Sequence, residues 1–197
     1  RRRHTRLQGD WSSDVCSSDL NHLLLGENKV QDTISKQTQF NSSSIEWHMI
    51  GHLQTNKVNK AVRAFSCIQS VDSLRLAEKI QNAAFNENKK MPVLIQLNLT
   101  GEEGKFGYSE NDFKDDHHQL FELPNLEIKG LMIMGPHTKD KEKIRKIFKH
   151  GKNLYDILKQ DYSTINILSM GMSQDYDIAV KEGSTMVRVG SLLTGGH

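Results

Sequence analysis

Residues 165–191 read INILSMGMSQDYDIAVKEGSTMVRVGS, and this stretch sets the expectation for the whole fold. The apolar runs at 165–168 and 186–189 have the length of strands, and Gly, Ser or Asn residues lie beside them. The segment between them has helical character at 174–182. A strand, a helix and a second strand in this order predict a parallel βαβ unit, because parallel strands need a long crossover.

The same alternation extends back through the chain. Five further apolar runs have strand length, at 23–25, 47–50, 67–71, 93–99 and 128–134. Amphipathic segments separate the runs, and two of these have a clear helical period. One places Leu74, Ala77, Ile80 and Ala84 on a single face, and the other carries a longer apolar stripe within 144–158. Seven strands alternating with helices predict an α/β fold with a parallel sheet and helices outside it.

Two architectures satisfy this pattern, an open doubly wound sheet and a closed barrel. An open sheet usually has a phosphate-binding glycine turn after its first strand, but the chain contains neither G-x-G-x-x-G nor G-x-x-x-x-G-K-[ST]. The barrel is therefore favoured. A TIM-type (β/α)8 barrel takes about 250 residues. Seven units within 21–197 predict an incomplete barrel whose first strand is missing or replaced.

Residues 1–20 differ in composition from the single barrel domain expected over 21–197. A basic start, RRRHTR, is followed by the Ser- and Asp-rich run DWSSDVCSSD, without the apolar segment of a signal peptide. A basic arm for nucleic acid is one interpretation. We expect instead a disordered or artefactual tail at a truncated end, and we leave it out of the fold prediction.

Charge and composition exclude several classes of function. The chain has 197 residues, with 26 Lys and Arg against 24 Asp and Glu, so its net charge of +2 gives no broad field for nucleic acid. No apolar run approaches the roughly 20 residues that span a bilayer. The two cysteines, Cys16 and Cys67, form no CxxC pair and predict neither a zinc site nor a disulfide framework. We expect a cytoplasmic protein without metal.

In a barrel of this type the chemistry lies at the carboxyl ends of the strands. The last two strands end in small residues that suit a phosphate group, namely Gly171 and Ser173 on one and Gly190 and Ser191 on the next. Ser173 also precedes the helical segment, so a helix N-cap is the alternative for that residue. The coincidence of two such loops on neighbouring strands favours the phosphate site.

Arg188 is the candidate charged residue of this site. It alternates with Val187 and Val189, so it points into the barrel if those two valines face the helices. A buried guanidinium needs an acceptor, which is either a carboxylate or a group on a ligand. An exposed arginine at a strand end is the alternative.

Six motifs occur in the order found in one known family, and they cover the chain from about residue 21 to its end. The chain resembles the YggS-type pyridoxal 5′-phosphate homeostasis proteins, whose barrel is related to the N-terminal domain of alanine racemase. The motifs are GENKVQ at 26–31, WHMIGHLQTNK at 47–57, SVDS at 70–73, LIQLNLTGEEGKFG at 94–107, KGLMIM at 129–134 and LSMGMSQDYDIAVKEGSTMVRVG at 168–190.

The resemblance implies a pyridoxal phosphate site with specific residues. Ser173, Gly190 and Ser191 correspond to phosphate contacts, beside Gly171 and Met172 of the same motif, and Arg188 corresponds to the partner of the pyridine nitrogen. An arginine stays protonated, so it would keep the ring nitrogen unprotonated and weaken the cofactor as an electron sink. Three further residues are expected to line the ring side of the mouth: Asn28, His52 and Asn56. For His52 an ordinary loop histidine is the alternative.

The lysine that forms the Schiff base in this family lies in a motif resembling A-V-S-K-T, which family spacing places near Leu7. No lysine precedes Lys29, and the first strand is missing from the same region. Lys29 and Lys57 are the nearest substitutes in sequence, but both are expected in solvated loops or helix starts. We therefore expect no catalytic residue in this chain, and weak, reversible cofactor binding.

The resemblance implies a protein that carries or buffers pyridoxal phosphate without established catalysis. Its expected partners are the cofactor and, as recipients, pyridoxal-phosphate-dependent apoenzymes, and we expect a monomer. An amino-acid racemase or decarboxylase on the same barrel is the alternative, weakened because a second domain would be expected after the last strand. A barrel that binds another phosphorylated metabolite would have no use for the GEN and HLQTNK segments.

Overall fold

The structure is a computed structural model that describes residues 23–39, 45–102 and 104–190. Its sheet has seven parallel strands in the sequential order β1-β2-β3-β4-β5-β6-β7. The strands are β1 (Leu23–Glu27), β2 (Ile45–Met49), β3 (Cys67–Val71), β4 (Met91–Leu97), β5 (Leu126–Ile133), β6 (Ile167–Met172) and β7 (Met186–Arg188). Within the described ranges the strand pairing runs from β1 to β7 and does not return to β1. The prediction of an incomplete (β/α)8 barrel is confirmed.

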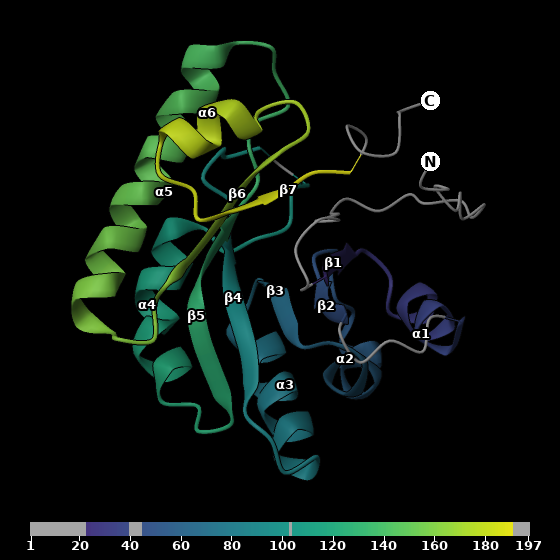
Figure 1. The fold of residues 1–197 in the computed structure, drawn as a ribbon. Coiled ribbons are helices and arrows are strands. Elements are labelled where there is room, and N and C mark those ends of the chain that lie inside the picture. Colours follow the sequence, from purple (N-terminus) through teal and green to yellow (C-terminus); the bar gives the residue numbers. More distant parts are fainter. Residues whose placement is uncertain (1–22, 40–44, 103, 191–197) are drawn as a thin grey trace, which may run out of the picture.

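A helical segment follows each of the first six strands and packs on the outside of the curved sheet (Figure 1). The helices are α1 (Val30–Gln39), α2 (Val58–Ala64), α3 (Leu74–Asn86), α4 (Glu110–Phe121), α5 (Lys141–Asp161) and α6 (Tyr176–Lys181), and the 3-10 turn η1 (Thr55–Lys57) precedes α2. The two helices expected from periodicity are α3 and α5. None of the helices in these ranges is long and apolar enough to cross a membrane.

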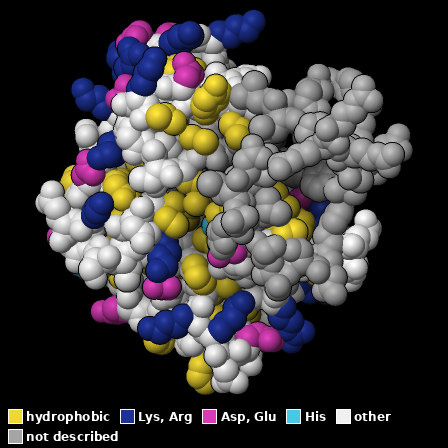
Figure 2. Space-filling model, in the orientation of Figure 1, with side chains coloured by type: hydrophobic (Ala, Val, Ile, Leu, Met, Phe, Trp, Pro, Cys, Tyr) yellow, Lys and Arg dark blue, Asp and Glu magenta, His cyan; other side chains and the backbone are white. Residues whose placement is uncertain are grey.

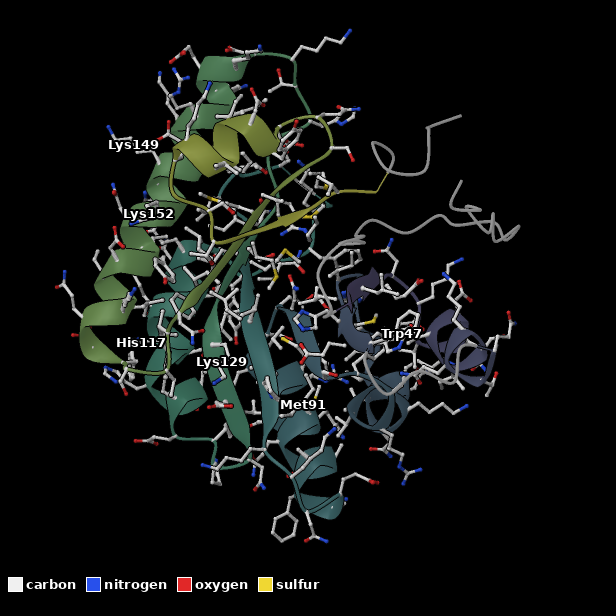
Figure 3. All side chains as sticks on the ribbon, in the orientation of Figure 1. Trp47, Met91, His117, Lys129, Lys149 and Lys152 are labelled. Carbon is white, nitrogen blue, oxygen red and sulfur yellow. The ribbon has the colours of Figure 1, made fainter. Side chains whose placement is uncertain are left out.

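The sheet separates a large outer core from a small inner one. The outer core lies between sheet and helices and includes Ile68, Ile95 and Phe148, all at most 1% exposed. On α5 the polar side chains Lys149 and Lys152 extend from the helix on the side away from the sheet (Figure 3). The inner core contains Cys67, Leu94 and Met132 from three adjacent strands. Burial raises the pKa of the Cys67 thiol to about 12, so this cysteine is a packing residue rather than a nucleophile.

A polar layer follows the inner core toward the carboxyl ends of the strands. Side chains two positions apart in a strand share a face. Gln69 therefore follows Cys67, Gln96 follows Leu94, and Ser169 follows Ile167 on the inner side. All three polar side chains are at most 5% exposed. The strands thus bring an apolar floor and a polar layer to the base of the site.

The last crossover differs from its sequence prediction. Strand β6 runs to Met172 instead of ending at residue 168, so Gly171 and Met172 belong to the strand rather than to the following turn. The sequence does not indicate this extension, because the polar Ser169 interrupts the apolar run. Its side chain faces the inner polar layer. Helix α6 begins at Tyr176, and its N-cap residue is Asp175. The alternative of Ser173 as N-cap is therefore wrong. The predictions for residues 1–20 and for Ser191 lie outside the described residues.

Basic side chains gather where α5 begins, as Figure 2 shows at the top of the molecule. The loop before this helix contributes the exposed Lys139, and the first turns contribute the exposed Lys141, Lys143 and Lys146. The exposed N-terminus of α5 is capped by the Asp140 carboxylate, which accepts hydrogen bonds from two backbone N–H groups of the first turn. This basic end lies on the same side of the sheet as the carboxyl ends of the strands.

Gly130 on β5 lies close to the backbone of the neighbouring strand β6. The pairing of β4 with β5 shifts register between Val93 and Leu94, and Gly130 adopts φ +153° beside this irregularity. A Cβ atom at this position would lie 1.7 Å from the carbonyl oxygen of Ile167 on β6. The backbone at this point therefore requires glycine.

We predict that Gly130→Ala lowers the free energy of unfolding by about 3 kcal/mol, because the new methyl group overlaps a neighbouring backbone. The control is Gly101→Ala, since Gly101 also has a positive φ, of 67°, but a Cβ there meets nothing within 4 Å. The control substitution should lower the free energy of unfolding by about 1 kcal/mol, because only the backbone conformation disfavours alanine there. Urea denaturation of both variants measures the difference, and equal losses would contradict the account.

Candidate functional site

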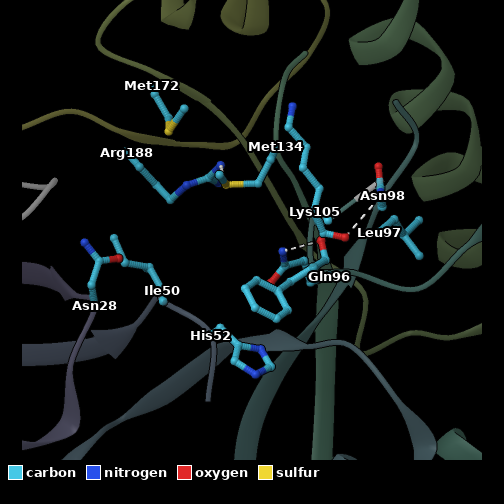
Figure 4. A pocket seen from close by; sticks show the side chains of 13 residues that line it. Asn28, Ile50, His52, Gln96, Leu97, Asn98, Lys105, Met134, Met172 and Arg188 are labelled. Atoms are coloured by element: carbon cyan, nitrogen blue, oxygen red, sulfur yellow. Dashed lines mark hydrogen bonds between the residues drawn. The ribbon is translucent and has the colours of Figure 1, made fainter. Parts of the chain in front are cut away.

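A cavity of about 260 Å³ opens at the carboxyl ends of the strands (Figure 4). Its walls come from the end of β1, the β2 and β4 loops, the end of β5, and strands β6 and β7. The lining residues are Asn28, Ile50, Gly51, His52, Gln96, Leu97, Asn98, Gly104, Lys105, Phe106, Met134, Met172 and Arg188. A second, larger cavity of about 880 Å³ adjoins it and shares Lys105, Met134 and Met172. The site is thus a small inner chamber beside a wider outer one.

Arg188 is the buried cation of the inner chamber, with 2% of its surface exposed. It lies inside the barrel, as its alternation with two valines predicted. Its Nη1 donates to Ser169 Oγ at 2.7 Å, and its Nη2 donates to the carbonyl oxygen of Ile133 at 3.0 Å. These are neutral acceptors. These two bonds hold the guanidinium in place on the chamber wall.

The two loops predicted to hold a phosphate meet in the structure. The backbone N–H of Gly190 donates to Ser173 Oγ at 3.2 Å, which joins the end of β7 to the end of β6. Ser173 and Met172 line the outer chamber. Gly171 does not line either chamber, because a Cβ on it would point at α6, 2.5 Å from the Cβ of Ala179. Its role is close packing of β6 against α6.

The residues expected on the ring side divide into two groups. Asn28 and His52 line the inner chamber. His52 stacks on Phe106 with ring centroids 3.7 Å apart, and its Nδ1 lies 3.1 Å from Asp72 Oδ2. Asn56 is exposed in η1 and does not line the chamber. The spacing of the HLQTNK segment thus brings its histidine to the site but not its second asparagine.

The loop from β4 to α4 contributes residues that the sequence reasoning missed. Its fold depends on Asn98, whose Nδ2 donates to the carbonyl oxygens of Glu102 and Lys105 and whose Oδ1 accepts from Thr100. Gly101, Gly104 and Gly107 adopt positive φ, which lets the loop turn back over the cavity. This glycine spacing was the available signal for a site loop.

Lys105 is the lysine that this loop brings to the chamber wall. Its Nζ donates to the carbonyl oxygen of Gly135 at 3.1 Å and lies 2.9 Å from Glu102 Oε2. The hydrogen bond from Lys105 lowers the pKa of the Glu102 carboxyl. The ammonium group is therefore engaged by two oxygens at the border between the two chambers.

A histidine completes the polar layer below the cavity. His48 on β2 is 5% exposed, and its Nδ1 lies 2.9 Å from Gln69 Nε2. Burial lowers the pKa of His48 from 6.5 to about 4, against a smaller opposing effect of Glu46. His48 is consequently neutral at physiological pH.

We predict that His48 makes the fold sensitive to acid. Its pKa is lower in the folded state, so the unfolded chain takes up the proton first as the pH falls from 6.5 toward 4. The loss over this window is about 3 kcal/mol of unfolding free energy. Urea denaturation at several pH values should show a smaller loss in His48→Gln than in the wild type. The control His118→Gln, at an exposed position of α4, should follow the wild type. An identical pH profile in His48→Gln would contradict the assignment.

Comparison with known proteins agrees with this fold. The family model of the alanine racemase N-terminal domain matches residues 26–197, which places the chain in that class of barrels. The pyridoxal phosphate homeostasis protein of Aquifex aeolicus is 40% identical over 171 residues, which are 86% of this chain and 75% of that protein. The Helicobacter pylori J99 protein of the same name is 39% identical over 170 residues, 85% of this chain and 75% of that protein. The chain belongs to the family of pyridoxal phosphate homeostasis proteins.

Solved structures show the same relationship. PipY of Synechococcus elongatus, solved without pyridoxal phosphate, superposes with a TM-score of 0.81 at 35% identity, covering 85% of this chain and 80% of PipY. PipY with pyridoxal phosphate bound superposes with a TM-score of 0.80 at 34% identity, covering 85% of this chain and 79% of PipY. Alanine racemase of Clostridium difficile is similar in fold, with a TM-score of 0.73 at 18% identity over 86% of this chain and 44% of the enzyme.

Proposed function

We propose that this chain binds pyridoxal phosphate with its ring in the inner chamber and its phosphate at the adjoining Ser173 loop, and that it carries or buffers the cofactor. The observation that supports this most strongly is the buried Arg188 on the chamber wall, at the end of β7, where Gly190 joins Ser173 at the end of the neighbouring β6. A planar ring beside Arg188 and a phosphate at the Ser173 loop fit this arrangement of one cation and small polar groups. The related PipY has been solved with pyridoxal phosphate bound.

Arg188 also favours storage over catalysis. When bound, pyridoxal phosphate supplies an aldehyde and an electron-accepting pyridine ring. A permanently protonated guanidinium facing the ring nitrogen would keep that nitrogen unprotonated, which limits electron withdrawal. The relatives of this chain are named as homeostasis proteins rather than as enzymes. We therefore propose a cofactor carrier without catalytic activity of its own.

Binding in this chain is proposed to be reversible, through the phosphate and the ring alone. Lys29 and Lys57 are exposed and do not line the inner chamber. Lys105 does line it, but its ammonium group is held by Glu102 and by the carbonyl of Gly135. A protonated amine has no lone pair for attack on an aldehyde.

The proposed recipients are pyridoxal-phosphate-dependent apoenzymes, served by a monomer in the cytoplasm. The free, buried thiol of Cys67 fits a reducing compartment. Mixing the loaded protein with such an apoenzyme and following its gain of activity would test transfer, and sedimentation would test the monomer.

We predict that Arg188→Lys weakens the binding of pyridoxal phosphate at least about tenfold, because lysine lacks the planar fork that holds both the interior oxygens and the ring. Isothermal titration measures the affinity, and a thermal melt checks that the variant is folded. The control is Arg63→Lys on α2, whose side chain is 67% exposed and lies outside the chamber. Unchanged affinity in a folded Arg188→Lys protein would overturn the proposed site.

A second prediction concerns the covalent state. Borohydride reduction of the chain with pyridoxal phosphate, followed by peptide mass spectrometry, should show only scattered, substoichiometric labelling of lysines. A stoichiometric adduct on one lysine, with Lys105 the position nearest the chamber, would contradict reversible binding while leaving the cofactor assignment intact.

A further inference from the structure

The polar layer beneath the cavity forms a continuous chain of hydrogen bonds that ends at Arg188. Ser169 Oγ lies 2.7 Å from Arg188 Nη1 and 2.7 Å from Gln69 Oε1, and Gln69 Nε2 lies 2.9 Å from His48 Nδ1. All four side chains are at most 5% exposed. The chain therefore runs through the barrel interior, where water does not compete with it.

The charge on Arg188 fixes the direction of every bond in this chain. A guanidinium only donates, so Ser169 Oγ accepts from it and gives its single hydrogen to Gln69 Oε1. The Gln69 amide must then present its NH₂ group to His48, whose Nδ1 accepts. His48 is therefore neutral, with its proton on Nε2. The low pKa of His48 agrees with a neutral ring.

The same chain joins strands that are not neighbours in the sheet. Gln69 lies on β3 and Ser169 on β6, which are separated in the sheet by β4 and β5. Gln69 Nε2 also lies 3.2 Å from Met186 Sδ at the start of β7. Strand β7 is only three residues long and lies at the end of the described ladder. Its backbone pairing is thus short, and the side-chain contacts across the barrel supply additional restraint on Arg188.

We infer that Gln69, acting through Ser169, positions the guanidinium of Arg188 for contact with the ring of the bound cofactor. This inference rests on the proposed function above. Gln69 and Ser169 are positioning residues, since neither lines the inner chamber. Without Ser169 Oγ, Arg188 loses one of its fixed acceptors, which loosens the orientation of its guanidinium.

The matched pair of variants is Ser169→Ala and Ser70→Ala. Both serines are 0% exposed and lie on interior strands, and both variants remove one hydroxyl group. Ser70 Oγ has no hydrogen-bond partner, so its loss leaves the chain to Arg188 unchanged. A second pair keeps the test valid if Ser169→Ala does not fold. Gln69→Leu removes the acceptor for Ser169, whereas Gln69→Glu restores a carboxyl oxygen in the same place.

The first measurement uses the protein without cofactor, so it does not depend on the proposed function. In nitrogen-15 NMR spectra, His48 should show a bare Nδ1 and a protonated Nε2. Hydrogen exchange at Arg188 Nε should rise at least about tenfold in Ser169→Ala and Gln69→Leu, and less than about twofold in Ser70→Ala and Gln69→Glu. Equal exchange in Ser169→Ala and Ser70→Ala, or a protonated Nδ1 on His48, would overturn the inference.

The second measurement separates positioning from general loss of structure. Ser169→Ala should weaken pyridoxal phosphate binding about tenfold and leave the binding of inorganic phosphate within about twofold, because only the former has a ring. Ser70→Ala should change neither. Equal weakening for both ligands, or no weakening for either, would overturn the positioning role. If the wild type did not bind pyridoxal phosphate, the proposed function would be refuted, and with it the positioning of Arg188 toward the cofactor ring. The exchange data would still show whether Gln69 and Ser169 hold Arg188 in place.

Discussion

A positive charge inside the barrel is the constraint on which the site depends. Arg188 is buried where no solvent reaches it, so the strands around it must supply oxygen acceptors. The structure provides the hydroxyl group of Ser169 and the carbonyl oxygen of Ile133, both neutral. These acceptors fix the guanidinium beside the cavity, where it can contact a bound ligand.

The layers of the barrel explain how this charge is tolerated. The apolar floor of Cys67, Leu94 and Met132 fills the inner core, and the polar layer above it carries Gln69 and Ser169. The period of two along each strand places both layers on the same inner face. The outer face of the same strands packs against the helices and supplies most of the apolar burial. Stability and binding therefore come from opposite faces of one sheet.

The sequence predicted the alternation of strands and helices, the two long helices and the inward Arg188, because these depend on local periodicity. It did not predict the extent of β6, since Ser169 interrupts an apolar run for a reason that only the folded interior reveals. It also missed Lys105 and Phe106, which reach the cavity through the turns of a glycine-rich loop. Asn56 was expected at the site but is turned outward by η1. Contacts made by loops and across the barrel depend on tertiary structure, which spacing along the chain does not encode.

In the proposed site, Arg188 faces the ring nitrogen of pyridoxal phosphate. The most direct measurement is the nitrogen-15 chemical shift of ring-labelled cofactor bound to the wild-type protein, followed across neutral pH. The account predicts an unprotonated ring nitrogen, because a guanidinium remains charged and has no lone pair to accept a proton. A protonated ring nitrogen in the bound cofactor would contradict it.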